Sequence, residues 1–354
     1  MKKLILYCII FYFFILYDHS YAQNGQSQFQ SENTSKLFLN QELLFLKLSF
    51  SRKDVRKTTN DSTYIKIDIS YMDSEALWNI FEAKLRKRGH YRLNNCYLPP
   101  IKIKINKSES KGTLFEGNKK LKLVLPCSIN KSHNDYIIKE YMAYKLYEII
   151  SPYHIKSRLV EIDFTDTTGK KTKTSDLKGI LLEDIKKVAN RFDGKVINRS
   201  IHPLNLDPLV SVRNEFFQFM IGNTDFSMAA LHNEKLLFVN KNMYPIPYDF
   251  DLSGLVDASY AFVPEVNERE QLPISSVTER LYRGFKRDSQ IIQRVRNEFI
   301  ENRTEIFKIV DNLSPYFENS SSFAIAKKYI EDFYNIIENN RKFENEIIYK
   351  LRTK

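Results

Sequence analysis

The stretch 221–258, IGNTDFSMAALHNEKLLFVNKNMYPIPYDFDLSGLVDA, decides how this chain is interpreted. An apolar, helix-like segment at 209–221 leads into it and ends at Gly222, and glycine commonly follows the last turn of a helix. The first acidic residue after this glycine, Asp225, is therefore expected in a loop. Among the carboxylate and amide side chains of the stretch are Asp225, Asn233, Asp249, Asp251 and Asp257.

Two short extended segments are expected within this stretch. Residues 236–239 are apolar, and two prolines favour an extended path through 244–248, so that Asn233 and Asp249 flank a strand-like element. Carboxylate and amide oxygens suit Mg²⁺ or Mn²⁺, especially when phosphate oxygens complete the coordination. The same residue types suit phosphoryl transfer, in which one Asp orients the attacking hydroxyl while an Asn and another Asp hold metal. Asp and Asn are also common turn formers, so a purely structural role stays open.

The N-terminal residues 1–22 have the pattern of a secretory signal peptide. Lys2 and Lys3 precede an apolar run over 4–17, and Ser-Tyr-Ala at 20–22 is a small-x-small cleavage site. The run is shorter than the roughly 20 residues that a membrane-spanning helix needs. We therefore expect an exported protein, periplasmic, at the cell surface or secreted, with no transmembrane segment after cleavage. Residues 23–40 begin with a Gln-, Ser- and Asn-rich segment and are expected to form a flexible leader.

The composition limits the classes of partner. The chain has 54 Lys and Arg against 43 Asp and Glu, a formal net charge of +11, which favours anionic partners such as a nucleotide, an acidic surface polymer or lipid headgroups. The basic residues are spread along the chain without an aromatic stacking motif, so nucleic acid is not an expected partner. Signal cleavage removes Cys8 and leaves Cys96 and Cys127, too few for a disulfide framework. Whether these two form one bridge or remain separate buried thiols is left open.

The segments before the central stretch are mostly strand-like, and those after it are mostly helical. Apolar alternation or clustering predicts strands, and a 3.6-residue period predicts helices. Lys122 lies in a predicted strand, Glu140 lies in a predicted helix, and Glu183 ends another strand. The expected strands are 43–50, 64–69, 101–105, 121–125, 157–164 and 179–183, and the expected helices are 75–87, 136–150, 277–285, 289–313 and 323–349.

This order of strand lysine, helix glutamate, loop aspartate, asparagine and DFD resembles the spore-coat CotH kinase family and, more distantly, HipA-like and protein-kinase-like proteins. The matching pieces are LKLVLP, KEYMAYKLYEIISP, GILLED and GNTDFS…HN…PIPYDFD, which cover about 122–257. The resemblance implies an α+β, two-lobed, protein-kinase-like fold. A mixed-sheet N-terminal lobe would span 41–184, and a helix-rich C-terminal lobe carrying the acidic site would span 185–354.

The resemblance also assigns roles. Lys122 would contact nucleotide phosphates, with Glu140 orienting it, and Glu183 would belong to the same cofactor site. Asp225 would be the catalytic aspartate. Three residues are candidate metal ligands, with the choice between the two aspartates open: Asn233, Asp249 and Asp251.

The function that follows is an exported, ATP-dependent and Mg- or Mn-dependent phosphotransferase, an atypical kinase. Its partners would be the nucleotide and a protein or other hydroxyl-bearing acceptor. The alternative is a non-catalytic exported interaction protein, or a pseudokinase, in which the acidic cluster shapes a binding surface. Convergence of the quoted regions in space would separate the two hypotheses.

Overall fold

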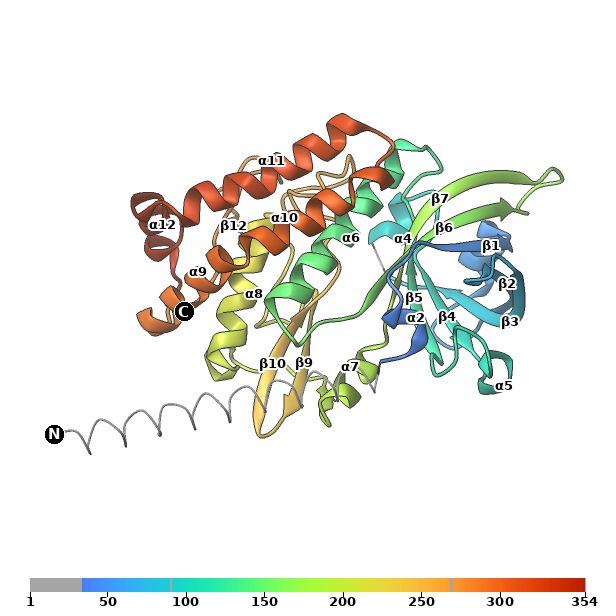
Figure 1. The fold of residues 1–354 in the computed structure, drawn as a ribbon, viewed down its shortest axis with the longest axis horizontal. Helices are drawn as coiled ribbons and strands as arrows, with labels where there is room; N and C mark the ends of the chain where they lie inside the picture. Colours follow the sequence, from blue (N-terminus) through green and yellow to red (C-terminus); the bar gives the residue numbers. More distant parts are fainter. Residues whose placement is uncertain (1–33, 90, 268–269, 354) are drawn as a thin grey trace, which may run out of the picture.

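The computed structural model describes residues 34–89, 91–267 and 270–353 (Figure 1). The predicted signal peptide at 1–22 lies outside the described residues, as does most of the predicted leader at 23–40. The described end of that leader forms α2 (Lys36–Leu39), in which Leu37 and Phe38 are buried. Within the described ranges, no helix is both long and apolar enough to cross a membrane.

The N-terminal part is a closed barrel of seven strands in the order β1-β2-β3-β4-β5-β7-β6. Neighbouring strands are antiparallel except β1 and β6, which run parallel with Leu44 opposite Val160. Side chains alternate along each strand, as in β4, where isoleucines are buried in the barrel and lysines face outward. The strands are β1 (Leu44–Phe50), β2 (Ile65–Met72), β3 (Trp78–Lys87), β4 (Ile101–Ile105), β5 (Lys120–Val124), β6 (Ser157–Asp166) and β7 (Lys173–Leu182).

This barrel corrects the predicted fold. The two-lobed, protein-kinase-like arrangement of a mixed sheet lobe and a helical lobe is wrong, because the sheet closes on itself. One reason that the fold prediction is wrong is the segment 75–87, which is predicted as a helix but contains β3. Phe81, Ala83 and Leu85 are buried there at every second position, which is the period of a strand. The other cause is the β1–β6 pairing, which joins segments far apart in the chain and leaves no local sequence pattern.

A second apolar core fills the helical part of the molecule. Helix α6 (Ser132–Ile150) lies between the barrel and the C-terminal helices, with Ile138 and Met142 fully buried (Figure 1). Leu159 and Ile180, from the outer face of the barrel, join the same core. The remaining helices and strands are α3 (Arg52–Thr58), α4 (Tyr91–Asn95), α5 (Lys107–Ser110), α7 (Ile185–Arg191), β8 (Lys195–Ile197), α8 (Pro208–Ile221), β9 (Glu234–Val239), β10 (Asn242–Pro247), β11 (Glu265–Asn267), β12 (Glu270–Gln271), α9 (Ser289–Glu301), α10 (Arg303–Asn312), α11 (Ser320–Ile337) and α12 (Asn340–Glu346).

Three predicted helices after residue 276 differ from the observed ones. The segments 289–313 and 323–349 each form two helices, and the first pair breaks at Asn302. The segment 277–285 is not helical. Its Arg280 donates hydrogen bonds of 3.1 Å to the carbonyl oxygens of Phe219 and Met220. These carbonyls belong to the last turn of α8, where the Gly222 N–H also donates to the Phe219 carbonyl oxygen, and Arg280 thus completes the end of that helix.

Helix α8 begins and ends as its sequence predicts. Asp207 caps its first turn by accepting a 2.9 Å hydrogen bond from the Val210 N–H. Gly222 ends it in the left-handed region, with φ +61°. A Cβ at Gly222 would lie 1.9 Å from the Tyr329 hydroxyl oxygen, and one at Gly254 would lie 2.3 Å from it. Both glycines therefore make room for one tyrosine of α11.

We predict that Gly222→Ala lowers the free energy of unfolding by about 2–4 kcal/mol, since alanine is strained at positive φ and also displaces the Tyr329 hydroxyl. Urea denaturation followed by circular dichroism measures this value. In a Tyr329→Phe background the same substitution should cost less, with about 1 kcal/mol of backbone strain remaining. Equal costs in the two backgrounds would remove the clash from the explanation.

Candidate functional site

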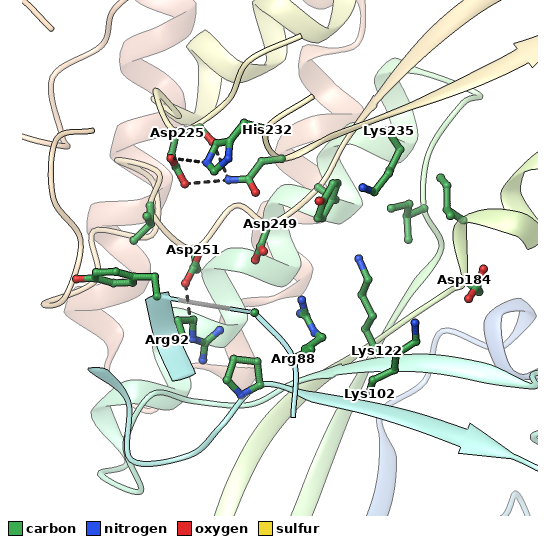
Figure 2. Close-up of a pocket in the computed structure, with 18 of the residues that line it drawn as sticks. Arg88, Arg92, Lys102, Lys122, Asp184, Asp225, His232, Lys235, Asp249 and Asp251 are labelled. Atoms are coloured by element: carbon green, nitrogen blue, oxygen red, sulfur yellow. Dashed lines mark hydrogen bonds and ion pairs between the residues drawn. The ribbon is translucent and has the colours of Figure 1, made fainter. Parts of the chain in front are cut away.

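A cleft of about 610 Å³ lies between the barrel and the loops around β9 and β10 (Figure 2). This volume is within the range of small-molecule sites. Its lining has two chemically distinct sides, with basic side chains mostly from the barrel and acidic side chains from the loops. The basic residues are Arg88, Arg92, Lys102, Lys122 and Lys235, and the acidic residues of the loops are Asp225, Asp249 and Asp251.

The first acidic residue, Asp225, is held by hydrogen bonds on both carboxylate oxygens. Its N–H donates to Asn223 Oδ1, which turns the chain after α8. A short bridge between Ser227 and His232 then brings the next residues back beside it. The ring of His232 lies 2.9 Å from Asp225 Oδ1, and Asn233 Nδ2 donates to Asp225 Oδ2 at 2.8 Å. Burial raises the pKa of Asp225, and His232 opposes this rise.

Asn233 and Asp249 meet at the base of the β9–β10 hairpin. The N–H of Tyr248 donates to the Asn233 carbonyl oxygen at 3.0 Å, and the N–H of Asp249 donates to the Tyr144 hydroxyl at 3.0 Å. Both residues have left-handed backbones, with φ +51° for Asn233 and +66° for Asp249. Asn and Asp tolerate this region better than most residues, and such conformations gather at functional sites.

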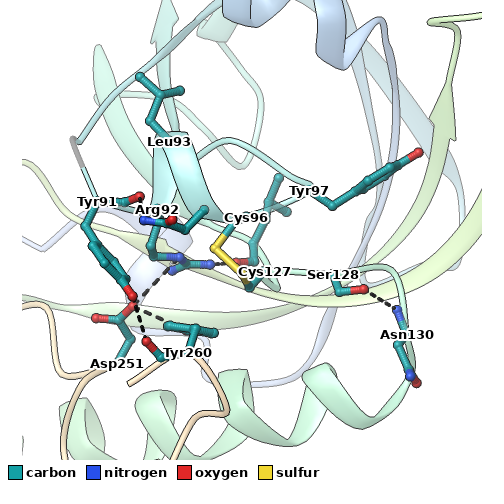
Figure 3. Close-up of a disulfide and its surroundings, with 12 residues drawn as sticks. Tyr91, Arg92, Leu93, Cys96, Tyr97, Cys127, Ser128, Asn130, Asp251 and Tyr260 are labelled. Carbon is teal, nitrogen blue, oxygen red and sulfur yellow. Dashed lines mark hydrogen bonds and ion pairs between the residues drawn. A yellow bond between two sulfur atoms is a disulfide. The ribbon is translucent and has the colours of Figure 1, made fainter. Parts of the chain in front are cut away.

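Asp251 lies deeper, in a buried charge cluster with Arg92 and Glu140. Arg92 Nε is 3.7 Å from Asp251 Oδ2, and the Tyr260 hydroxyl donates to the same oxygen at 3.3 Å (Figure 3). Burial and the charge of Asp249 raise the pKa of Asp251 to about 6, against the effect of Arg92. Burial, Asp251 and Asp249 likewise raise the pKa of Glu140. Asp251 and Glu140 therefore bind protons more readily than ordinary carboxylates do.

A disulfide holds the helix that supplies Arg92. Cys96 and Cys127, whose pairing the sequence leaves open, are bonded, with their Cα atoms 4.5 Å apart (Figure 3). The bond joins the end of α4 to the segment after β5, and the guanidinium of Arg92 donates to the Leu125 carbonyl oxygen in that segment. Removing the cross-link would thus loosen α4 and its contact with Asp251.

The basic side of the cleft is built by strand register. Lys102 and Lys122 are directly opposite each other on β4 and β5 and point to the same face. Lys122 Nζ lies 4.3 Å from the centre of the Tyr248 ring. Burial, and next the positive charge of Arg88, lower the pKa of Lys122 to about 7, although Asp249 opposes this. A bound anion would favour the charged ammonium and so raise the pKa of Lys122 again.

The residues predicted from sequence are placed as follows. Six of them line the one cleft: Lys122, Glu183, Asp225, Asn233, Asp249 and Asp251. Glu140 is buried outside this lining, and no ion pair joins it to Lys122 in the described part of the chain. The carboxylate of Glu183 contacts Arg191 at 3.2 Å and accepts the Lys156 N–H at 3.2 Å, so it faces protein groups. The assigned roles of these residues stay predictions.

Several lining residues were not predicted. Arg88 and Arg92 follow β3 in the basic run RKRGHYR, which carries no motif of its own. Lys102 could have been found, because in IKIKI it has the same outward parity that singled out Lys122 in LKLVL. Lys235 comes two positions after Asn233 and lies 5.1 Å from the Tyr248 ring centre.

No protein-family model matches this chain, and no curated protein matches it either. The CotH resemblance therefore rests on the quoted residues alone.

A buried hydrogen-bond chain supports the acidic loop from α8. Asn214 and Gln218 donate to Glu234 Oε1 at 2.8 and 3.4 Å, and Asn223 donates to Gln218 Oε1 at 2.9 Å. Asn223 in turn accepts the Asp225 N–H, so the chain connects the residue after Asn233 to the backbone of Asp225. Burial raises the pKa of Glu234 to about 8, against these hydrogen bonds.

We predict that Glu234→Gln gains stability relative to the wild type as pH rises. The pKa of Glu234 in the folded chain exceeds its unfolded value, so folding binds a proton and the wild-type unfolding free energy falls between about pH 4.5 and 8. The variant has no carboxyl group at this position and lacks this pH dependence. Between pH 5.5 and 8.5, the unfolding free energy of the variant minus that of the wild type should therefore rise on the order of 3 kcal/mol. Urea denaturation at both pH values measures it, with the exposed Glu346→Gln as control. Parallel pH profiles for all three proteins would contradict the assignment.

Proposed function

We propose that this cleft binds ATP with a divalent cation and transfers a phosphoryl group to a hydroxyl-bearing acceptor. The observation that supports this is that Lys102 and Lys122, which form no ion pair with a carboxylate among the described residues, lie in one cleft with the clustered aspartates (Figure 2). Lys102 and Lys122 suit a chain of phosphates, and Asp249 suits the cation that such phosphates carry. Neither the lysines nor the aspartates alone would select ATP together with a divalent cation.

The donor set fits a cation that is shared with phosphate oxygens. In addition to burial, the charge of Asp249 raises the pKa values of Asp225 and Asp251, and an added positive charge would oppose this effect. The Nδ2 of Asn233 donates hydrogen bonds to Asp225, whereas its Oδ1 accepts no hydrogen bond within the described residues. In these residues, no three His, Cys, Asp or Glu side chains form a complete metal site. Mg²⁺ commonly takes one or two protein carboxylates plus substrate phosphates.

Each side chain then has a distinct task. The bound Mg²⁺ or Mn²⁺ supplies positive charge to the transferring phosphate. Lys122 and Lys102 neutralise the remaining phosphate oxygens. Asp249 and Asn233 are the candidate ligands of the metal ion. Asp225, with a raised pKa, accepts the proton of the acceptor hydroxyl, and His232 orients its carboxylate. Export of the chain remains part of this proposal and rests on residues 1–22.

A second candidate is a pseudokinase or an exported interaction protein. It is favoured by the hydrogen bonds on both oxygens of Asp225, from His232 and Asn233, which satisfy the carboxylate without substrate. In that case the cleft would bind nucleotide, or another anion, without transfer.

The central prediction compares two aspartates. Asp249→Asn should abolish Mg²⁺-dependent ATP binding, measured by calorimetry, because the cation would lose its ligand. Asp225→Asn should keep ATP binding but lower phosphate transfer by about 10²-fold, since its task is performed in the transition state. The exposed Asp163→Asn on β6 is the matched control and should change neither value.

The outcomes separate the two candidates. Wild-type protein that binds ATP with Mg²⁺ but transfers no phosphate to water or to a protein mixture would support the pseudokinase. Absence of Mg²⁺-dependent ATP binding in the folded wild type would overturn the proposal.

The pKa of Lys122 supplies a further prediction. Below pH 7 the ammonium is charged in the free protein, and above it the charge is progressively lost. ATP affinity should therefore fall about 10-fold from pH 6 to 8 through this group. In Lys122→Arg the cation stays charged, so its affinity should change less over the same range. The comparison at matched pH cancels the ionisation of ATP itself, and identical slopes would exclude Lys122 from phosphate binding.

A further inference from the structure

Basic side chains form two rows across the outer face of the barrel. In the row nearer the cleft, Arg86 is opposite Lys102, and Lys102 is opposite Lys122. The next row continues over four strands, in the order Lys66, Lys84, Lys104 and Lys120. Adjacent strands lie about 4.8 Å apart, so each row places like charges at close, regular intervals.

Most of these cations lack an acidic partner. Lys66 pairs with Glu82 at 3.1 Å, and Arg86 pairs with Asp61. In the part of the chain that the structure describes, the other five form no ion pair with a carboxylate; we call them the cationic track: Lys84, Lys102, Lys104, Lys120 and Lys122. Like charges directly opposite each other destabilise a sheet. The track therefore carries repulsion that a bound polyanion would relieve.

The track is continuous with the cleft. Lys102 and Lys122 line the cleft itself, while Lys104 and Lys120 are the next outward-facing residues on the same two strands. Lys84 extends the second row onto β3. An anionic chain lying on the track would thus lead directly to the space between Lys122 and the acidic loop.

We propose that the part of the cationic track outside the cleft, Lys84, Lys104 and Lys120, binds an acidic peptide segment of the acceptor, next to the residue whose hydroxyl enters the cleft. The acceptor role rests on the function proposed above, whereas the binding of an acidic peptide does not. An extended peptide has side chains every 3.3 Å or so, and flexible lysines can follow carboxylates at that spacing. The proposal thus names the acceptor class as a protein segment rich in Asp, Glu or phosphorylated residues.

Two other anionic partners fit less well. A lipid surface would need apolar side chains beside the lysines, but the exposed Trp78 and Ile80 are separated from the second row by Asp68, opposite Glu82. Single-stranded nucleic acid would need stacking platforms. The aromatic rings beside the two rows are already in contact with cations of the rows: Tyr64 with Arg86 and Lys104, each 5.7 Å from its centre, and Tyr248 with Lys122 at 4.3 Å.

The test uses a fluorescein-labelled peptide, Glu-Glu-Glu-Ser-Glu-Glu-Glu, and measures its binding by fluorescence anisotropy at low ionic strength. Lys84→Glu combined with Lys104→Glu should weaken binding at least 10-fold, because two attractive charges become repulsive. Lys170→Glu combined with Lys171→Glu, on the exposed β6–β7 turn, changes the net charge equally and should have less than a 2-fold effect. Lys84→Gln with Lys104→Gln is a milder variant for the case that charge reversal prevents folding.

Each alternative has its own outcome. Equal weakening by both reversed pairs would show a net-charge effect and overturn the track. Tighter, track-dependent binding of phosphatidylserine vesicles or of an oligonucleotide would overturn the peptide assignment. ATP binding should be unchanged in the track variants. Peptide binding that persists in a protein without ATP binding would refute the proposed function and leave the track standing.

Discussion

The parallel pairing of β1 with β6 is the contact on which the rest of the structure depends, because it closes the barrel. Closure removes the free sheet edges and encloses a core to which all seven strands contribute apolar side chains. The outer face of β6 and β7 is then available to pack against helices, and α6 covers it. That helix brings Tyr144 under the β9–β10 hairpin, where it accepts the N–H of Asp249. The position of the acidic loop thus follows from how the barrel closes.

Apart from Arg92 with Asp251, the lysines and arginines of the cleft form no ion pair with its carboxylates among the described residues. Lys122 lies over the Tyr248 ring instead of pairing with Asp249, and Asp225 is bonded to His232 and Asn233. Charges that are desolvated without direct partners cost stability. An anion that brings its own cation would satisfy both sides at once, and this is the physical basis of the ATP–metal proposal. The same reasoning explains why burial and the charge of Asp249 raise the pKa of Asp251, while burial and neighbouring cations lower that of Lys122.

Local patterns in the sequence predicted much of this structure. The ends of α8, the existence of α6 and the strands carrying Lys102 and Lys122 follow from periodicity and from Gly222. The residues of the acidic loop were found because they cluster in one stretch. The segment EALWNIFEAKLRK was mistaken for a helix, since its apolar residues fit both periods and burial alone decides between them. Barrel closure, the Cys96–Cys127 bond and the arrival of Arg88 in the cleft depend on long-range pairing, which no window of sequence reports.

Tyr329 on α11 contacts two glycines, Gly222 and Gly254, and so limits which substitutions these positions can accept during evolution. The Tyr329 hydroxyl fills the space that a side chain at Gly222 or Gly254 would need, and the two glycines are also joined by a 3.1 Å backbone hydrogen bond. A larger residue at position 222 requires the side chain at 329 to shift or become smaller, and position 222 retains its positive φ even then. A Cβ at position 254 would also lie 2.5 Å from the Val277 carbonyl oxygen. Among descendants of this sequence, positions 222 and 329 are therefore expected to vary together, whereas 254 stays glycine.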